Sequence, residues 1–329
     1  MIDHRLRPQQ YRGELSLPAS VAPAQPGRRR SIAVVGASGF VGSATVQALS
    51  VLPCQVTAVV RRRPRVPQHG VRYELADITD LRSLTTALAG IDVVVHAASY
   101  TGPDERLCRR ITGVGTENIL AAAAMNKIEH VISISSIGVY GPGPFTDVTE
   151  DSREPSPLTV LSTARAVADQ LVRTHGGTTV RPGFIHGSGD RWFLPGLHRI
   201  LDTAQAWIGH GSALLSVIAV DELGALIAEL ASDCSPDDRG ALFHAAHPQP
   251  VTVEEATIGL GNRNFVAPSV SCTYAEALSR ATDLGLTARE IDLVGQDHTI
   301  DSTKIWARVG MTPSPSPLGA TYRRRLTTN

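Results

Sequence analysis

Short apolar runs alternate with longer amphipathic segments from Ser31 onward. Segments with helical periodicity lie at Phe40 to Leu49, Leu81 to Leu88, Thr116 to Met125 and Leu161 to Arg173. The apolar runs between them are rich in β-branched residues, a pattern typical of strands buried on both faces. They occupy Ile32 to Val35, Val56 to Val60, Val71 to Leu75, Ile91 to His96, Val131 to Ser135 and Thr178 to Val180. The alternation predicts an α/β protein with a Rossmann-type, doubly wound parallel sheet.

The pattern changes on both sides of this region. After about residue 185, Pro-, Gly- and Ser-rich stretches separate helix-like segments at Trp192 to Ala206, Asp221 to Ala231 and Tyr274 to Thr282. We therefore expect a Rossmann domain over residues 31–185 and a smaller, mainly substrate-binding lobe over residues 186–329. Residues 1–30, rich in Arg and Pro, are expected to form an extended arm. The arm is interpreted as a disordered leader, with contact to a partner subunit or a cofactor as the alternative.

Composition excludes several classes of protein. Lysine and arginine total 31 and aspartate and glutamate total 31, so a footprint on nucleic acid phosphates is not expected. With 42% hydrophobic residues the chain can form a sizeable core. Neither a signal peptide nor an apolar run long enough to cross a membrane is apparent. The four cysteines are far apart and lack metal-ligand spacing, which indicates no disulfide framework and no metal site. A reduced, cytoplasmic protein is the simplest interpretation, and its oligomeric state stays open.

A glycine-rich loop directly follows the first predicted strand. It reads Gly36-Ala37-Ser38-Gly39-Phe40-Val41-Gly42 and opens into a predicted helix. This is the position that the dinucleotide fingerprint requires, with a pyrophosphate resting on the helix N-terminus. We predict that Gly36, Ser38, Gly39, Phe40 and Val41 contact the cofactor; an ordinary tight turn is the alternative.

The end of the second strand indicates which dinucleotide binds. NAD-selective sites place an acidic residue there, but this chain has Arg61, Arg62 and Arg63. A guanidinium can engage a 2′-phosphate bidentately, so Arg61 and Arg62 predict NADP or NADPH. The alternative, a solvated surface turn, applies to one or two of the three arginines.

Two further segments fit the same cofactor. Asp77 and Ile78 follow the third strand and would flank the adenine, although Asp77 could equally cap the next helix. His96-Ala97-Ala98-Ser99 ends the fourth strand, where the small side chains of Ala97 and Ala98 leave room for the cofactor. His96 itself is interpreted as a packed strand residue.

These motifs form an ordered set together with Ser135 to Gly141, Arg181 to Gly187, Val220 to Glu222 and Thr303 to Gly310. Over about residues 31–320 the chain resembles an extended short-chain dehydrogenase/reductase of the epimerase/dehydratase type. The resemblance implies that Ser136 is the catalytic hydroxyl that holds the substrate oxygen. It also implies that Pro182 and Phe184 lie beside the nicotinamide and that Asp221 caps a helix of the substrate lobe.

The family's central catalytic pair is missing. That pair is a Tyr with a Lys four residues later, whose ammonium lowers the pKa of the phenol. Alignment of the family's helix places Leu161 at the Tyr position and Arg165 at the Lys position, and Thr112 replaces a helix asparagine. Leu161 cannot donate a proton, whereas Arg165 is a poor acid that can still donate hydrogen bonds to the ribose or to an oxyanion.

Two outcomes are physically open: the substrate supplies its own acid, or the fold no longer catalyses. The first fits a ketone of a polycyclic aromatic polyketide that lies beside a phenol. The chain also resembles the atypical ketoreductases of actinomycete antibiotic pathways, which implies NADPH-dependent reduction with a proton from substrate or water. The alternatives are a non-catalytic NADP redox sensor and a nucleotide-sugar epimerase or dehydratase, whose chemistry relies on the missing Tyr.

Candidate substrate contacts are small polar and aromatic side chains around the expected crevice. Core packing is the alternative for each aromatic residue. His186 could also be structural or a proton relay, and Ser162 and Thr163 could hold a water molecule. The predicted substrate-binding residues are Ser99, Tyr100, Tyr140, His186 and Trp192, and Phe184, Phe193 and Trp207 are further aromatic candidates.

Overall fold

The computed structural model describes residue 17 and residues 29–102, 104–261 and 265–319. Most of the predicted N-terminal arm therefore lies outside the described residues. Leu17 is described and is buried, and its backbone N–H donates to the carbonyl of His175 (3.3 Å). This residue of the arm therefore packs on its own chain.

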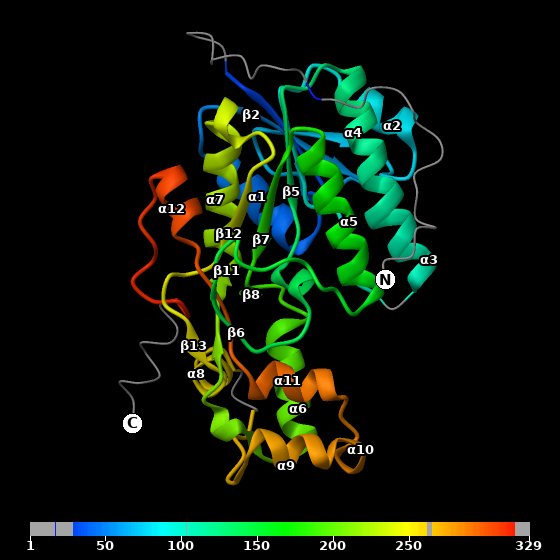
Figure 1. Ribbon diagram of the computed structural model, residues 1–329. Coiled ribbons are helices and arrows are strands. Elements are labelled where there is room, and N and C mark those ends of the chain that lie inside the picture. The colour runs from blue at the N-terminus through cyan, green and yellow to red at the C-terminus, as the bar shows by residue number, and fades with distance from the viewer. Residues whose placement is uncertain (1–16, 18–28, 103, 262–264, 320–329) are drawn as a thin grey trace.

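A seven-stranded parallel sheet forms the centre of one half of the molecule (Figure 1). Its strand order is β12-β7-β5-β4-β1-β2-β3, and the direction of the order reverses at β1. This confirms the predicted doubly wound Rossmann sheet. The strands are β1 (Ser31–Val35), β2 (Gln55–Val60), β3 (Val71–Leu75), β4 (Val93–His96), β5 (His130–Ile134), β7 (Thr178–Pro182) and β12 (Leu242–Ala245).

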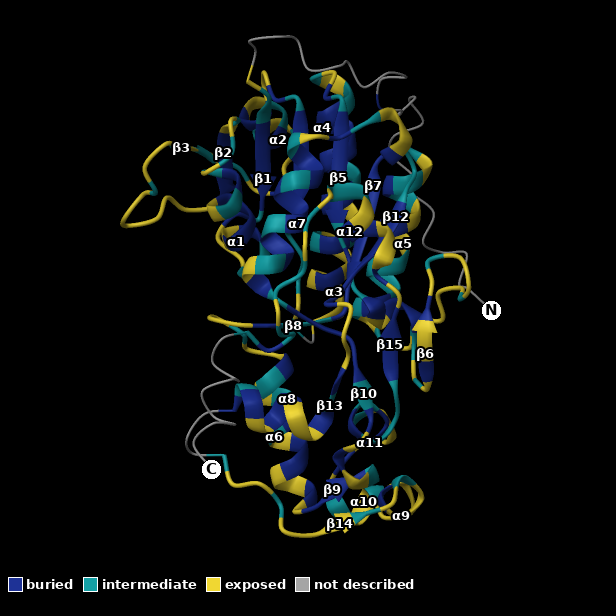
Figure 2. Cartoon of the chain, turned by 90° about the vertical axis from the view of Figure 1, so that its left-hand side faces the viewer, coloured by how far each residue is buried: buried dark blue, intermediate teal, exposed yellow. Residues whose placement is uncertain are grey.

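Helices cover both faces of this sheet, and each face has its own apolar core (Figure 2). One face packs against α1 (Phe40–Leu49), α7 (Val220–Ser232) and α12 (Thr303–Val309). The other packs against α2 (Leu81–Ala87), α4 (Gly115–Met125) and α5 (Val160–Thr174). A short helix α3 (Glu105–Cys108) and a π-helix η2 (Arg109–Val114) lead into α4.

Local chemistry fixes where these helices begin. The Asp80 carboxylate accepts from the backbone N–H groups of Arg82 and Ser83 and so caps α2. Thr159 caps α5, and the Ser162 hydroxyl accepts in return from the Thr159 N–H. Ser162 is thereby engaged in a capping box, which argues against a role in holding a catalytic water. The resemblance placed Asp221 as a cap, but Ala219 occupies the N-cap of α7 and Asp221 lies in its first turn.

The second half of the molecule is a smaller lobe of short elements (Figure 1). A four-stranded sheet there has the order β13-β10-β15-β6, and two further strand pairs are β11 with β8 and β14 with β9. The strands are β6 (Phe145–Val148), β8 (Phe184–His186), β9 (Trp207–Ile208), β10 (Leu214–Leu215), β11 (Val217–Ala219), β13 (Val251–Thr252), β14 (Ser271–Cys272) and β15 (His298–Ile300). The helices are α6 (Phe193–Ala204), α8 (Val253–Leu260), α9 (Tyr274–Ser279), α10 (Ala281–Leu284) and α11 (Ala288–Gly295), with the 3₁₀ turn η4 (Gly209–Gly211). Two further 3₁₀ turns, η3 (Ile137–Tyr140) and η5 (Pro236–Asp238), respectively follow β5 and precede β12.

The chain crosses between the two halves more than once. After the expected boundary at residue 186 it returns to the large sheet, because β12 pairs with β7 and α7 and α12 pack on the same face as α1. Conversely, β6 belongs to the small sheet although it precedes the boundary. A single division at residues 185 and 186 is therefore wrong, since sheet membership depends on pairing between distant segments.

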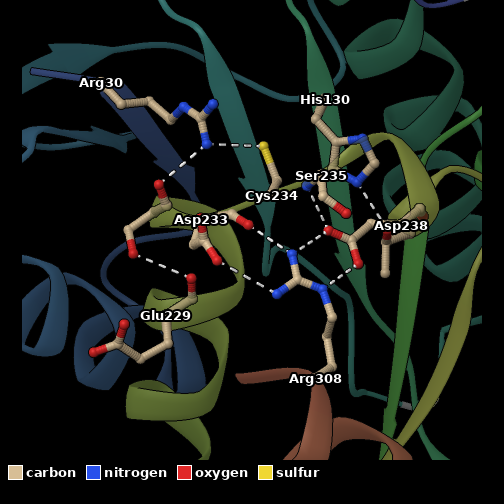
Figure 3. A network of polar contacts seen from close by, with 10 residues as sticks. Arg30, His130, Glu229, Asp233, Cys234, Ser235, Asp238 and Arg308 are labelled. Atoms are coloured by element: carbon tan, nitrogen blue, oxygen red, sulfur yellow. Dashed lines mark hydrogen bonds and ion pairs between the residues drawn. The ribbon is translucent and has the colours of Figure 1, made fainter. Parts of the chain in front are cut away.

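A polar network ties the amino-terminal edge of the large sheet to α7 and α12 (Figure 3). Arg308 in α12 forms two hydrogen bonds of 2.7 Å to the buried Asp238 carboxylate and an ion pair with Asp233. Arg30 donates to the Ser232 carbonyl (3.1 Å) and to the Cys234 thiol (3.2 Å). All four cysteines of the chain are free thiols.

Candidate active site

In sheets of this kind the ligand crevice lies outside the carboxyl ends of the strands where the order reverses, which here places it beside the loops after β1 and β4. Gly36 has a φ of +87°, and a Cβ atom there would lie 2.6 Å from the Ala98 nitrogen. Only glycine permits this contact, because both the backbone conformation and the space exclude a side chain. The structure therefore brings the predicted Gly36 loop and Ala97-Ala98 together at one edge of the sheet.

The first turn of α1 faces this crevice without a side-chain cap. Gly39 is its N-cap residue and provides no side-chain hydrogen bond, and the first turn contains no acidic residue. Gly42 lets the helix begin next to the loop, because a Cβ atom there would lie 2.2 Å from the Gly36 carbonyl oxygen. The Gly39 N–H donates to the Gly36 carbonyl (2.9 Å), and the N–H groups of Ser38, Phe40 and Val41 beside it suit a pyrophosphate.

The predicted determinants of the cofactor type lie beyond β2 and β3. Arg61 and Arg62 are exposed at the start of a loop that projects from the body of the molecule (Figure 2). The Asp77 carboxylate accepts from the backbone N–H and hydroxyl of Thr79, both at 2.8 Å. These hydrogen bonds, with the positive charge of Arg61 nearby, lower the pKa of Asp77. Since Asp80 caps α2, the capping alternative for Asp77 is wrong.

Ile78 is held against α4. Its carbonyl accepts from the Asn118 side chain (3.0 Å), and a Cβ atom at Gly115 would lie 2.8 Å from its side chain. Asn118 and Gly115 were not singled out from the sequence, because their role depends on a contact about 40 residues away along the chain.

The end of β4 combines a packed histidine with an unpaired hydroxyl. The Thr116 hydroxyl donates to the Thr112 carbonyl (2.6 Å), so it accepts from His96 Nε2 at 3.0 Å. Burial lowers the pKa of His96 to about 4, so it is neutral and structural, in agreement with its interpretation as a packed residue.

The Ser99 hydroxyl oxygen is buried and has no hydrogen-bond partner among the described residues. It is a polar atom poised for a ligand.

Ser136 occupies the N-cap position of η3, directly after β5. Its hydroxyl oxygen accepts from the Gly138 N–H at 3.1 Å, which orients the side chain and leaves its hydrogen free to donate. Ser136 is half-buried, so a substrate oxygen can approach.

Leu161 and Arg165 lie on α5, one helical turn apart. The Arg165 Nε atom is buried without a hydrogen-bond partner, and no carboxylate in the described part of the chain forms an ion pair with Arg165. Burial lowers the pKa of Arg165. The next acidic residue on this helix, Asp169, instead pairs with Arg181 at 2.8 Å. A buried Nε donor without a partner marks a position where a ligand can supply the hydrogen bond.

Two predicted substrate contacts are corrected by the structure. Tyr140 is fully buried and its hydroxyl donates to His244 Nε2 (2.5 Å) and accepts from Arg181 (3.0 Å). His244 Nδ1 faces the Asp301 carbonyl (3.2 Å), which fixes these donor and acceptor roles. Tyr140 is therefore a core residue whose hydroxyl is already satisfied.

His186 is the second correction. Its exposed fraction is 4%, and Nε2 donates to the Pro317 carbonyl at 2.8 Å. Burial lowers its pKa. The side chain holds the C-terminal segment in place, which is the structural alternative foreseen for it.

The other aromatic candidates differ in access. Trp192 is 63% exposed and precedes α6, whereas Trp207 is buried in the core of the small lobe. Phe184, adjacent to Pro182, stacks on Phe193 with ring centroids 5.1 Å apart. Tyr100 is half-buried. Trp192, Tyr100 and Phe184 thus keep surface for a planar ligand.

The sequence analysis missed the buried cluster of Arg181, Asp169, Tyr140 and His244. Arg181 was recognised only as part of a motif, and Asp169 carried one available signal, its spacing of four residues from Arg165 on the same helix face. His244 could not be found in this way, because it lies 104 residues from Tyr140.

Of the helices in the described ranges, none is both long and apolar enough to cross a membrane. Over the same ranges, no three His, Cys, Asp or Glu side chains are grouped as a metal ion would require.

Comparisons with known proteins agree with this geometry. A sequence model described as "NAD dependent epimerase/dehydratase family" matches residues 32–191. A 4-hydroxy-2-methyl-3-oxo-4-farnesyl-3,4-dihydroquinoline-1-oxide ketoreductase of Stigmatella aurantiaca is 31% identical over 306 residues, covering 84% of this chain and 90% of the relative.

Solved structures support the same fold. A dTDP-glucose 4,6-dehydratase from Streptomyces venezuelae with NAD bound has a TM-score of 0.69 at 20% identity and covers 91% of this chain and 97% of its own. A UDP-glucose 4-epimerase from Thermus thermophilus in complex with NAD has a TM-score of 0.67 at 17% identity, with coverages of 89% and 96%.

Proposed function

Because the chain belongs to the NAD-dependent epimerase/dehydratase family of extended short-chain dehydrogenases/reductases, we propose that it is an NADPH-dependent ketoreductase. Its substrate is a ketone of a polycyclic aromatic polyketide in antibiotic biosynthesis. The resemblance to the angucyclinone 7-ketoreductase of simocyclinone biosynthesis favours an angucyclinone-like ring system and its C-7 carbonyl. The Stigmatella relative supports this class, since its name specifies a ketone on a fused ring.

One observation carries the proposal. The crevice suits a nicotinamide dinucleotide, yet Leu161 and Arg165 stand where the family has its acid pair. Epimerases and dehydratases of the family need that Tyr, so a sugar-nucleotide substrate is disfavoured. A ketone beside a phenol needs no protein acid, because the phenol can supply the proton.

Each residue of the candidate site has a separate role in the proposed reaction. The reduced nicotinamide would supply a hydride to the carbonyl carbon. Ser136 donates a hydrogen bond to the carbonyl oxygen, since its own oxygen is already engaged with the Gly138 N–H. Ser99 and Arg165 offer unsatisfied polar atoms to the ribose or to developing negative charge. Tyr100, Trp192 and Phe184 contact the planar rings.

The remaining cofactor contacts follow the fold. The Gly36 to Val41 loop holds the pyrophosphate, Ala97, Ala98 and Pro182 leave space for the nicotinamide half, and Asp77 and Ile78 flank the adenine. Arg61 and Arg62 bind the 2′-phosphate of NADPH. Residues 31–185 apart from β6, together with α7, β12 and α12, form the NADP-binding domain, and the smaller lobe mainly binds the substrate.

The test is NADPH oxidation, with NADH as the control cofactor, against ketones that either carry or lack a neighbouring phenol. Turnover confined to the phenol-bearing ketones is expected. Tight NADPH binding without turnover of any ketone would contradict the proposal and indicate a redox sensor.

The Ser136→Ala variant tests the role of the protein hydroxyl. We expect kcat to fall about two- to tenfold, because a single neutral hydrogen bond contributes about 0.5–1.5 kcal/mol. The measurement is steady-state kinetics with a phenol-bearing ketone, with NADPH affinity as a check on folding. A complete loss of activity in a folded variant would show that Ser136 does more than orient the oxygen.

A further inference from the structure

Arg165 lies just beyond the strands, at the edge of the crevice. Asp169 pairs with Arg181, the penultimate residue of β7, so Asp169 is level with the carboxyl end of the sheet. Helices that connect parallel strands run antiparallel to them, and four residues of helix span about 6 Å. Arg165, four residues nearer the start of α5, is therefore one turn past the strand ends, where the cofactor and substrate meet.

No carboxylate in the described part of the chain lies within ion-pair distance of Arg165; the Asp169 carboxylate acts on it from farther away and offsets only part of the lowering of its pKa by burial. The Arg165 Nε atom is buried and unpaired, while the residue keeps partial exposure. The neighbouring Cys108 thiol does not supply a counter-charge, because burial raises the pKa of Cys108. A largely enclosed cation without an anion is costly unless a ligand provides the anion.

Asp169 would be the natural partner of Arg165, since residues four apart on a helix face each other. In the structure the Asp169 carboxylate forms its ion pair with Arg181 instead. Arg181 holds Asp169 at 2.8 Å, donates to the Tyr140 hydroxyl at 3.0 Å and lies over the Tyr140 ring at 5.0 Å. Tyr140 is in turn bound to His244, so Arg181 is fixed from two sides and holds Asp169 in an ion pair of its own.

We propose that Arg165 binds the phenolate form of the substrate, and that Arg181 is a positioning residue that keeps Arg165 unpaired by holding Asp169. The inference rests on the proposed function and specifies its substrate as a ketone with an acidic phenol beside it. The carbonyl carbon gains the hydride and the carbonyl π pair moves to its oxygen. The phenol O–H bond breaks, its proton joins that oxygen, and its electron pair stays as the phenolate that Arg165 stabilises. The phenolate regains a proton from solvent after release.

The test measures the ionisation of a bound phenol rather than turnover. The probe is 1-hydroxyanthraquinone, a phenol beside a ring ketone, whose absorbance changes on ionisation. It is titrated with pH in a complex of the full chain with NADP⁺, so that no reduction takes place. A guanidinium within contact distance lowers the pKa of the bound phenol by about one to three units relative to the free probe.

Variants at Arg165 separate the charge from other effects. Arg165→Met, which keeps the bulk and removes the charge, is expected to abolish the shift, and Arg165→Lys is the charge-retaining control. NADP⁺ affinity is measured in parallel. An unchanged phenol pKa in Arg165→Met with weakened NADP⁺ binding would overturn the inference and assign Arg165 to the cofactor.

Failure of the probe to bind the wild-type complex would also overturn the inference. The proposed function is judged separately, because turnover of ketones that lack a phenol would still establish a reductase. No turnover of any ketone would count against both.

Variants at Arg181 test the positioning role. Arg181→Met frees Asp169 to pair with Arg165, so the phenol pKa is expected to rise toward that of Arg165→Met, and adding Asp169→Asn is expected to restore the shift. Tyr140→Phe is the matched control, since it removes one hydrogen bond of Arg181 but keeps its pair with Asp169. If Arg181→Met does not fold, Asp169→Asn alone tests the positioning role of Arg181. A bound-phenol pKa that stays low in Asp169→Asn supports that role. A bound-phenol pKa that rises in this variant would overturn it.

Discussion

Two arginines near the carboxyl edge of the sheet differ completely in their surroundings. Arg181 has a carboxylate, a phenol hydroxyl and an aromatic ring as partners, whereas the Arg165 Nε has none among the described residues. Residue type alone does not distinguish them. The difference arises because Asp169 forms its ion pair with Arg181 and acts on Arg165 only from a longer distance. At the residue scale, function therefore depends on which of several possible contacts is made.

A second charged group, Arg61, is proposed to decide which cofactor binds. It is exposed after β2, and its positive charge contributes to the low pKa of Asp77. Arg61→Glu is expected to raise the KM for NADPH about 10- to 100-fold relative to that for NADH, because a bidentate phosphate contact is lost and a repulsive charge added. Arg65→Glu, in the same exposed loop, is the control and is expected to have little effect. Equal loss with both cofactors would contradict a 2′-phosphate contact.

At the scale of elements, the cofactor helix is held by close packing on α7. A Cβ atom at Gly224 of α7 would lie 2.7 Å from the Ala44 carbonyl carbon and 2.8 Å from its oxygen. The glycine thus sets the distance between α1 and α7, and with it the position of the first turn of α1 in the crevice. Because the clash involves backbone atoms of α1, a side chain cannot be accommodated by a rotamer change.

The consequence can be measured with two helix glycines. Gly224→Ala is expected to destabilise the protein by about 1–3 kcal/mol, since the two helices must separate. Gly196→Ala in α6 is the matched control, because a Cβ atom there meets nothing within 4 Å. That change is expected to be neutral or to stabilise by up to about 1 kcal/mol. Equal effects of the two substitutions in urea unfolding would contradict the packing argument.

At the scale of the whole molecule, distant segments close the amino-terminal edge of the large sheet. His130, at the start of β5, contacts the Thr178 hydroxyl at 2.7 Å, and that hydroxyl donates to the Asp238 carbonyl. Asp238 also receives Arg308 from α12, so strands β5 and β7 and the helices α7 and α12 meet in one network (Figure 3). Burial lowers the pKa of His130 to about 4, despite the nearby Asp238.

This buried histidine makes stability depend on pH. The unfolded chain protonates His130 near its ordinary pKa of 6.5, while the folded protein resists protonation until about pH 4. The stabilisation is therefore complete above about pH 6.5 and is lost as pH falls toward 4. His130 is expected to contribute about 2 kcal/mol to the loss of stability between about pH 7.5 and 5.

Urea unfolding of His130→Gln at both pH values tests this contribution. The loss of stability on acidification is expected to be about 2 kcal/mol smaller than in the wild type. His69→Gln changes an exposed histidine and is the control. A pH dependence that is the same in His130→Gln as in the wild type would show that other buried groups, such as His96, dominate the acid sensitivity.

The sequence by itself determined the elements and the cofactor loop, because both depend on local pattern. The helix Phe40–Leu49 and the strand Val71–Leu75 have the predicted bounds, and the Gly36 loop stands between strand and helix as the fingerprint requires. The absence of any Tyr followed by a Lys four residues later was also readable, since it is a matter of residue types at one spacing. Tertiary structure alone decided that Tyr140 and His186 are internal, that β12 joins the first sheet, and that Asp169 is paired with Arg181. Each of these depends on a partner far along the chain, and periodicity carries no information about which distant groups satisfy a buried polar atom.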